Sequence, residues 1–106
     1  MPIQIQLLDA SDVVLATSSV ESRGDQYSGS IDLRAMPPRI REIFERYENI
    51  VNDQSLSLLD QIEDEINDLH LAARLGADTF KIKDVQIFPE AGTVFFKTVR
   101  EPLRVA

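Results

Sequence analysis

The acidic side chains, which could attract a basic partner or serve acid–base chemistry, gather in one stretch of the chain. Seven of the 18 acidic residues lie between Tyr47 and Ala73, where there is no lysine or arginine. They are Glu48, Asp53, Asp60, Glu63, Asp64, Glu65 and Asp68. The other eleven acids are balanced by the eleven basic residues of the chain, so this stretch accounts for the whole net charge of −7. Phosphates would be repelled there, so we do not expect this face to bind nucleic acid.

The only histidine is His70, which follows the acidic residues. Helical spacing places it on one face with Glu63 and Asn67, and a metal could be held by His70 with a carboxylate one turn away. The Glu-x-x-His pattern of ferritin-like metal sites is not met, because Asn67 stands three residues before His70. We therefore favour a solvated acidic helix surface, and we expect no metal and no cofactor.

Motifs for covalent catalysis are missing from the sequence. There is no cysteine, no Gly-x-Ser-x-Gly and no Ser-x-x-Lys, and the four glycines are too widely spread to build a phosphate-binding loop. An enzyme or small ligand-binding domain remains the alternative. Its active groups would be Tyr27, Tyr47, His70 and carboxylates, placed in a pocket between sheet and helices.

Basic residues gather near the C-terminus, at Lys81, Lys83, Lys97, Arg100 and Arg104. With Phe95 and Phe96 they could form an RNA-binding sheet face, since such faces combine aromatic stacking with positive charge. Phenylalanines in a strand are more often core residues, and we favour that interpretation.

The element that must position the acidic residues is a helical unit over residues 37–75. Pro37-Pro38 precedes it, Gly76 follows it, and apolar residues recur inside it at helical spacing. A continuous helix over 39–75 would be about 55 Å long, whereas a strand of eight residues spans about 27 Å. We therefore favour a turn at residues 52–55 that gives a helical hairpin, with Ser57 and Asp60 at capping-box spacing. One long helix, whose overhang a second subunit would bury, is the alternative.

The flanking segments show the two-residue period of strands. We expect a hairpin of residues 3–8 and 13–20, a third strand over 27–34, and a C-terminal hairpin over 80–100 that turns at 88–93. Gly29 inside the third strand indicates a bulge or a close contact. The apolar phase shifts by one residue at Lys83-Asp84, which is typical of a β-bulge. Residues 101–106 are expected to be a tail.

The sequence therefore predicts one α+β domain over residues 1–106: three strands in 1–36, the helical unit, then the C-terminal hairpin. The sheet would be antiparallel with about five strands, and a helical hairpin or one long kinked helix would cover one of its faces. No signal peptide or apolar run of ~20 residues is seen, so we expect a cytoplasmic protein.

For function, we expect a non-enzymatic protein-interaction module of the inhibitor, immunity or adaptor type. Its candidate surface for a basic partner is the acidic face formed by Asp60, Glu63, Asp64 and Asp68. We also expect self-association, as a dimer. The candidate contacts between copies are Leu58, Ile62, Phe95 and Val99.

Overall fold

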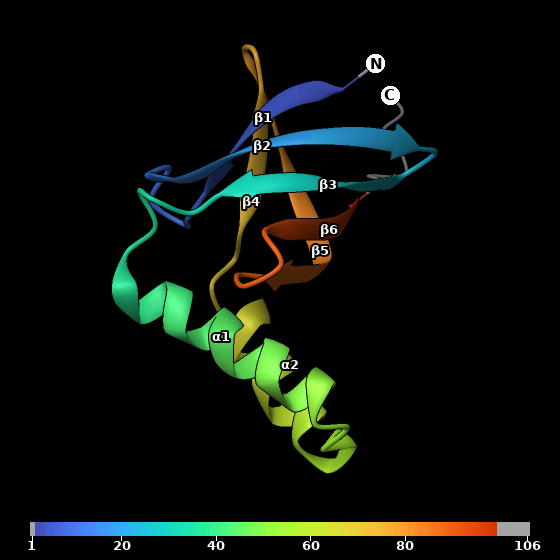
Figure 1. Cartoon of the computed structure of the whole chain (residues 1–106). Helices are drawn as coiled ribbons and strands as arrows, with labels where there is room; N and C mark the ends of the chain where they lie inside the picture. The colour runs from blue at the N-terminus through green and yellow to red at the C-terminus, as the bar shows by residue number, and fades with distance from the viewer. Residues whose placement is uncertain (1, 100–106) are drawn as a thin grey trace.

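Six antiparallel strands close into a barrel, and two helices lie at one end of it (Figure 1). The computed structural model describes residues 2–99. The elements in chain order are β1 (Ile3–Leu8), β2 (Val14–Arg23), β3 (Gln26–Asp32), α1 (Pro38–Asn52), the short 3-10 helix η1 (Leu56–Leu58), α2 (Leu59–Asn67), β4 (Ala72–Leu75), β5 (Asp78–Phe88) and β6 (Thr93–Thr98). Around the barrel the order is β1-β2-β3-β6-β5-β4, and β4 pairs back onto β1.

The predicted open sheet of about five strands, covered on one face by helices, is wrong. The error lies at the end of the helical unit, because α2 stops at Asn67 and Ala72–Leu75 forms a strand. His70 takes a left-handed backbone conformation, with φ 51°, between the helix and this strand. β4 then pairs with β1 on one side and β5 on the other. Without β4, the edge strands of the sheet would be β1 and β5. Because β4 pairs with both of them, the sheet closes into a barrel.

Most of the other predicted elements are confirmed. The β1–β2 hairpin, the third strand, and the β5–β6 hairpin all form. The register of β5 shifts between Lys83 and Gln86, and Asp84 has φ 53°, so the predicted bulge is present. The predicted tail lies outside the described residues.

The close approach of β2 and β3 requires a glycine at position 29. A Cβ built on Gly29 would lie 2.0 Å from the backbone oxygen of Ser19 on β2. Only glycine fits at that separation, as the sequence suggested. Val20, the partner of Gly29 across the β2–β3 pair, is fully buried in the barrel, as is Phe96 of β6.

The helices form the predicted hairpin, with its turn at residues 52–55. Pro38 opens α1 in the first helical position, and Gln54 takes φ 56° in the turn. Ile40 and Phe44 of α1 and Ile62 of α2 are buried in the same core cluster as the barrel interior. The hairpin thus closes one end of the barrel while its tip projects beyond it, which gives the molecule extents of 44 × 28 × 27 Å (Figure 1).

The capping box predicted for the second helix does not form. The residue before α2 is Leu58, and neither it nor Ser55 before η1 makes a side-chain cap hydrogen bond. Within the described part of the chain, no helix has the length and apolar character needed to cross a bilayer.

Candidate functional site

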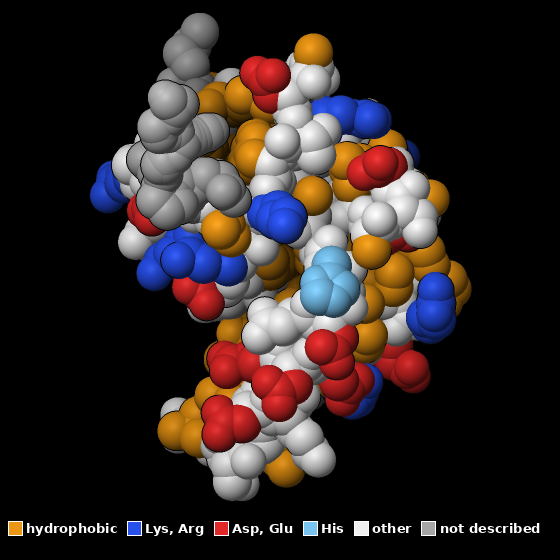
Figure 2. Space-filling model, turned by 180° about the vertical axis from the view of Figure 1, so that it is seen from behind, with side chains coloured by type: hydrophobic (Ala, Val, Ile, Leu, Met, Phe, Trp, Pro, Cys, Tyr) orange, Lys and Arg blue, Asp and Glu red, His pale blue; other side chains and the backbone are white. Residues whose placement is uncertain are grey.

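The four residues of the predicted acidic face lie along α2 and directly after it, with Glu63 on the side toward the barrel. Asp60, Glu63 and Asp64 belong to α2, Asp68 follows it directly, and all four are exposed. Figure 2 shows acidic side chains gathered over the helical end of the molecule, while most of the lysines and arginines in this view lie on the barrel. None of the ion pairs among residues 2–99 involves these four carboxylates. Their charge is therefore available to a partner.

Two other acidic residues of the same stretch stabilise the fold. Glu48 is 7% exposed, and its carboxylate accepts the backbone N–H groups of Glu90 at 3.0 Å and Ala91 at 3.4 Å, in the β5–β6 turn. Glu65 forms an ion pair of 2.7 Å with Arg46, which links α2 to α1. The hydrogen bond from Arg46 lowers the pKa of Glu65. Sequence spacing does not separate these structural acids from the free ones.

The predicted contacts between copies do not form one surface. Leu58 is 47% exposed at the hairpin tip, beside Leu56 at 64%. Ile62, however, is 2% exposed and belongs to the core of the monomer, so it offers almost no surface to a second copy. Phe95 is half-buried, and Val99, 37% exposed, follows the end of β6 on the barrel.

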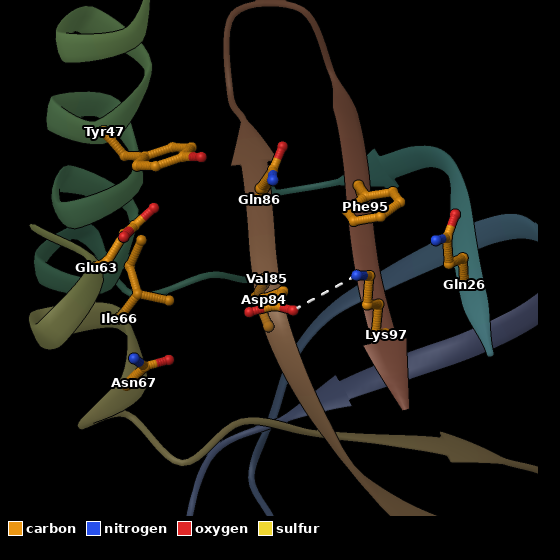
Figure 3. Close-up of a pocket in the computed structure, with 10 residues that line it drawn as sticks. All are labelled: Gln26, Tyr47, Glu63, Ile66, Asn67, Asp84, Val85, Gln86, Phe95 and Lys97. Carbon is orange, nitrogen blue, oxygen red and sulfur yellow. Dashed lines mark ion pairs between the residues drawn. The ribbon is translucent and has the colours of Figure 1, made fainter. Parts of the chain in front are cut away.

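A polar groove separates the helices from β5 and β6. It has a volume of about 270 Å³, and Figure 3 shows its lining: Gln26, Tyr47, Glu63, Ile66, Asn67, Asp84, Val85, Gln86, Phe95 and Lys97. Tyr47 and Glu63 lie on the helical wall and face the strands, where Asp84 pairs with Lys97 at 3.8 Å. The sequence alternative of a pocket between sheet and helices therefore has a physical counterpart.

A second, more apolar hollow of about 340 Å³ continues this groove. The two share Ile66, Asn67 and Val85. The remaining lining residues of the second hollow are His70, Leu71, Lys81, Ile82 and Val99.

The three candidate proton-transfer residues are not brought together. The ring of Tyr27 stacks on Phe96 at 5.3 Å, and His70 lines the second hollow, whereas Tyr47 lies in the polar groove. Burial and, to a lesser extent, the charge of Glu63 raise the pKa of Tyr47. Among residues 2–99, no three histidine, aspartate or glutamate side chains come together as a metal site would require.

The predicted RNA-binding face is also divided by the fold. Phe96 points into the barrel and is fully buried, whereas Phe95, on the opposite side of β6, lines the polar groove. Lys81 and Lys83 are exposed on β5. Arg100 and Arg104 lie outside the described residues. A stacking platform that uses both phenylalanines is therefore excluded.

Comparison with protein families, curated proteins and solved structures finds no match to this chain. The interpretation of the site thus rests on its own geometry and charge.

Proposed function

We propose that the protein is a non-enzymatic, cytoplasmic interaction module whose helical hairpin binds a basic partner protein. The observation that supports this is a set of four exposed carboxylates on α2 and directly after it, none of which forms an ion pair with another described residue, on a hairpin that projects from the barrel. An inhibitor, immunity or adaptor protein that covers a basic surface uses such charge complementarity.

Charge alone would not give the complex its affinity. Exposed ion pairs contribute only about 0.2–1 kcal/mol each and are screened by salt. Leu56 and Leu58 at the tip supply exposed apolar surface next to the acids. Beside Leu58, a hollow of about 300 Å³ between the helices is lined by Ile50 and Ile62. The partner would therefore present an apolar anchor surrounded by lysines and arginines.

Self-association is a second candidate, and it is supported by the same tip. Leu56 and Leu58 are 64% and 47% exposed, and contact with a second copy would bury both side chains. Lys81 and Lys83 on the barrel offer opposite charge to the acidic face of that copy. Light scattering during size-exclusion chromatography tests this: a dimer mass that falls to the monomer mass with Leu56→Ser/Leu58→Ser supports it, and a constant monomer up to high concentration rejects it.

The partner proposal is tested by reversing the charge of the acidic face. Asp60, Asp64 and Asp68 are changed together to lysine, while Glu63 is kept because it also lines the groove. The control reverses three exposed acids of the barrel side, Asp12, Glu21 and Asp78. We expect the partner recovered by co-purification to be lost with the first variant, retained with the control, and released by salt from the wild-type protein. Equal recovery with both folded variants would contradict the proposal.

A further inference from the structure

We propose that the groove between α2 and the β5–β6 strands binds a small organic cation with an apolar tail. This site is separate from the hairpin tip and faces the barrel. Its polar part is lined by Tyr47, Glu63 and Lys97, and its apolar continuation begins at Ile66 and Val85 (Figure 3).

The first argument is the hydroxyl group of Tyr47. The residue is 5% exposed, and its ring packs against Phe88 at a centroid distance of 5.7 Å. None of the side-chain hydrogen bonds found among residues 2–99 uses its hydroxyl group. Figure 3 shows this group directed toward the strand wall of the groove. Although most of Tyr47 is buried, its hydroxyl group is accessible from the groove, because no fully buried side-chain oxygen or nitrogen among residues 2–99 lacks a hydrogen-bond partner. A ligand in the groove can therefore bond to this group directly.

The second argument is the charge of the lining. Asp84 and Lys97 lie opposite Glu63 and offset each other's charge at 3.8 Å. The carboxylate of Glu63 forms no ion pair among the described residues, so the polar part of the groove has an excess negative charge, which Lys81 offsets from the second hollow. An ammonium group would donate to this carboxylate and to the oxygen of the Tyr47 hydroxyl. An anionic head group placed at Glu63 would be repelled by this carboxylate.

The third argument is the continuity of the polar and apolar parts. The second hollow adds Leu71 and Ile82, both buried, and exposed Val99 to the shared Ile66 and Val85. With volumes of about 270 and 340 Å³, the two parts together match the size of a small-molecule site, about 300–1,000 Å³. A ligand with its cation at Glu63 would place an alkyl or aryl tail along the apolar lining.

The test uses three probes that share one tail and differ in the head group: hexylamine, hexan-1-ol and hexanoate. Binding is followed by NMR, because the side-chain amide signals of Asn67 and Gln86 lie in the groove. We expect saturable shifts of both signals with hexylamine. The two other probes should bind at least about tenfold more weakly, as expected for the loss of a charge-assisted hydrogen bond. Equal binding of all three would show that only the tail partitions into the apolar part, and would overturn the proposal.

Two substitutions and a control locate the binding. Glu63→Gln and Tyr47→Phe should each weaken hexylamine binding at least about fivefold, since each removes one polar partner but keeps the side-chain shape. The control Asp60→Asn removes an exposed charge from the same helix at a position outside the lining, and affinity should stay within about twofold. Undiminished binding by folded Glu63→Gln would overturn the proposal, whatever the stability of Tyr47→Phe.

The proposal for the groove and the proposal for the acidic face can be rejected independently of each other. A variant with asparagine at 60, 64 and 68 retains every lining residue of the groove and adds no lysine beside Glu63. It should lose the partner protein while it still binds hexylamine through Glu63 and Tyr47. Loss of amine binding in this variant, with its fold intact, would show that the amine binds the exposed acidic face and would contradict a separate site in the groove.

Discussion

Asp32, at the end of β3, has a pKa that is lowered by its contact with Arg34 two residues later. The side chain of Arg34 donates to its carboxylate at distances down to 2.6 Å, and the backbone N–H of Arg34 donates at 3.0 Å. These hydrogen bonds lower the pKa of Asp32 from 3.8 to about 2. Because the pKa is lower in the folded protein, the stabilisation is complete above pH 3.8 and is lost as the pH falls toward 2.

An NMR titration of the Asp32 carboxyl group checks this assignment. Arg34→Ala should raise the pKa of Asp32 toward the ordinary value, because both side-chain donors and the positive charge are removed. Arg41→Ala, which removes an arginine that pairs with Glu45 instead, is the control and should leave Asp32 unchanged. The assignment fails if Asp32 titrates identically in the wild-type protein and Arg34→Ala.

Glu48 should contribute to stability rather than to binding. Its two carboxylate oxygens accept the Glu90 and Ala91 N–H groups, and the residue is 7% exposed. Replacement by alanine would leave these donors without their partner, and we expect a loss of about 1–3 kcal/mol in the free energy of unfolding, measured in urea. Glu42→Ala, an exposed change on the same helix, should cost less than about 0.5 kcal/mol. Equal losses for the two variants would contradict this role.

Residue types alone could not divide the acidic stretch into its structural and exposed members. Helical spacing correctly placed Asp60 and Asp64 outside. Glu48 lies one residue after Tyr47, on the side of α1 that meets the β5–β6 turn, and that turn comes from a segment 42 residues further along the chain. Its burial therefore follows from a distant contact, which local spacing does not contain.

At the scale of elements, the turn between α1 and α2 carries a backbone strain that can be relieved. Gln54 has φ 56°, a conformation that glycine adopts at no steric cost. Gln54→Gly should therefore stabilise the protein by up to about 1 kcal/mol, despite the greater entropy of glycine in the unfolded chain. Gln61→Gly, at an exposed position inside α2, should instead destabilise it by about 1 kcal/mol. A lower urea midpoint for Gln54→Gly than for the wild-type protein would contradict this.

The spacing of apolar residues predicted the elements that are long enough for the apolar pattern to recur several times. The apolar stripe correctly predicted α1, and the one-residue shift in the apolar pattern at Lys83-Asp84 correctly predicted the bulge of β5. β4 was missed because it has only four residues, Ala-Ala-Arg-Leu, and alanine, leucine and arginine favour helices in isolation. In the structure, buried Leu71 and Ala73 alternate with half-buried Ala72 and Arg74, an alternation that the sequence shows only through the polar Arg74. It is too short to outweigh the helical pattern before it.

For the whole molecule, closure of the barrel depends on residues far apart in sequence. Leu7 of β1 pairs with Ala73 of β4, and the Arg74 side chain donates to Gln6 at 2.6 and 2.9 Å. Nothing in either strand alone specifies this partner. An open sheet and a closed barrel share the same alternation within each strand, so the sequence pattern could not distinguish them.

Closure makes β4 a central strand, and this can be tested at Ala73. The residue is fully buried between Leu7 of β1 and Phe80 of β5. Ala73→Pro removes a backbone donor from a strand that is paired on both sides, so we expect a loss of about 3 kcal/mol or more in urea unfolding. In a marginally stable domain, this would also speed amide hydrogen exchange throughout β1 and β5.

The matched control for that substitution is Ala10→Pro. Ala10 is exposed and follows Asp9 in a turn closed by the Asp12 N–H, which donates to the Asp9 carbonyl at 3.0 Å. Proline is favoured at this position of a turn, so the variant should unfold within about 0.5 kcal/mol of the wild-type protein. If Ala73→Pro were equally tolerated, β4 would not be bonded on both sides, and the sheet would be open at that point. The hairpin would then no longer be anchored to a closed barrel, because β4 is the segment through which α2 returns to it.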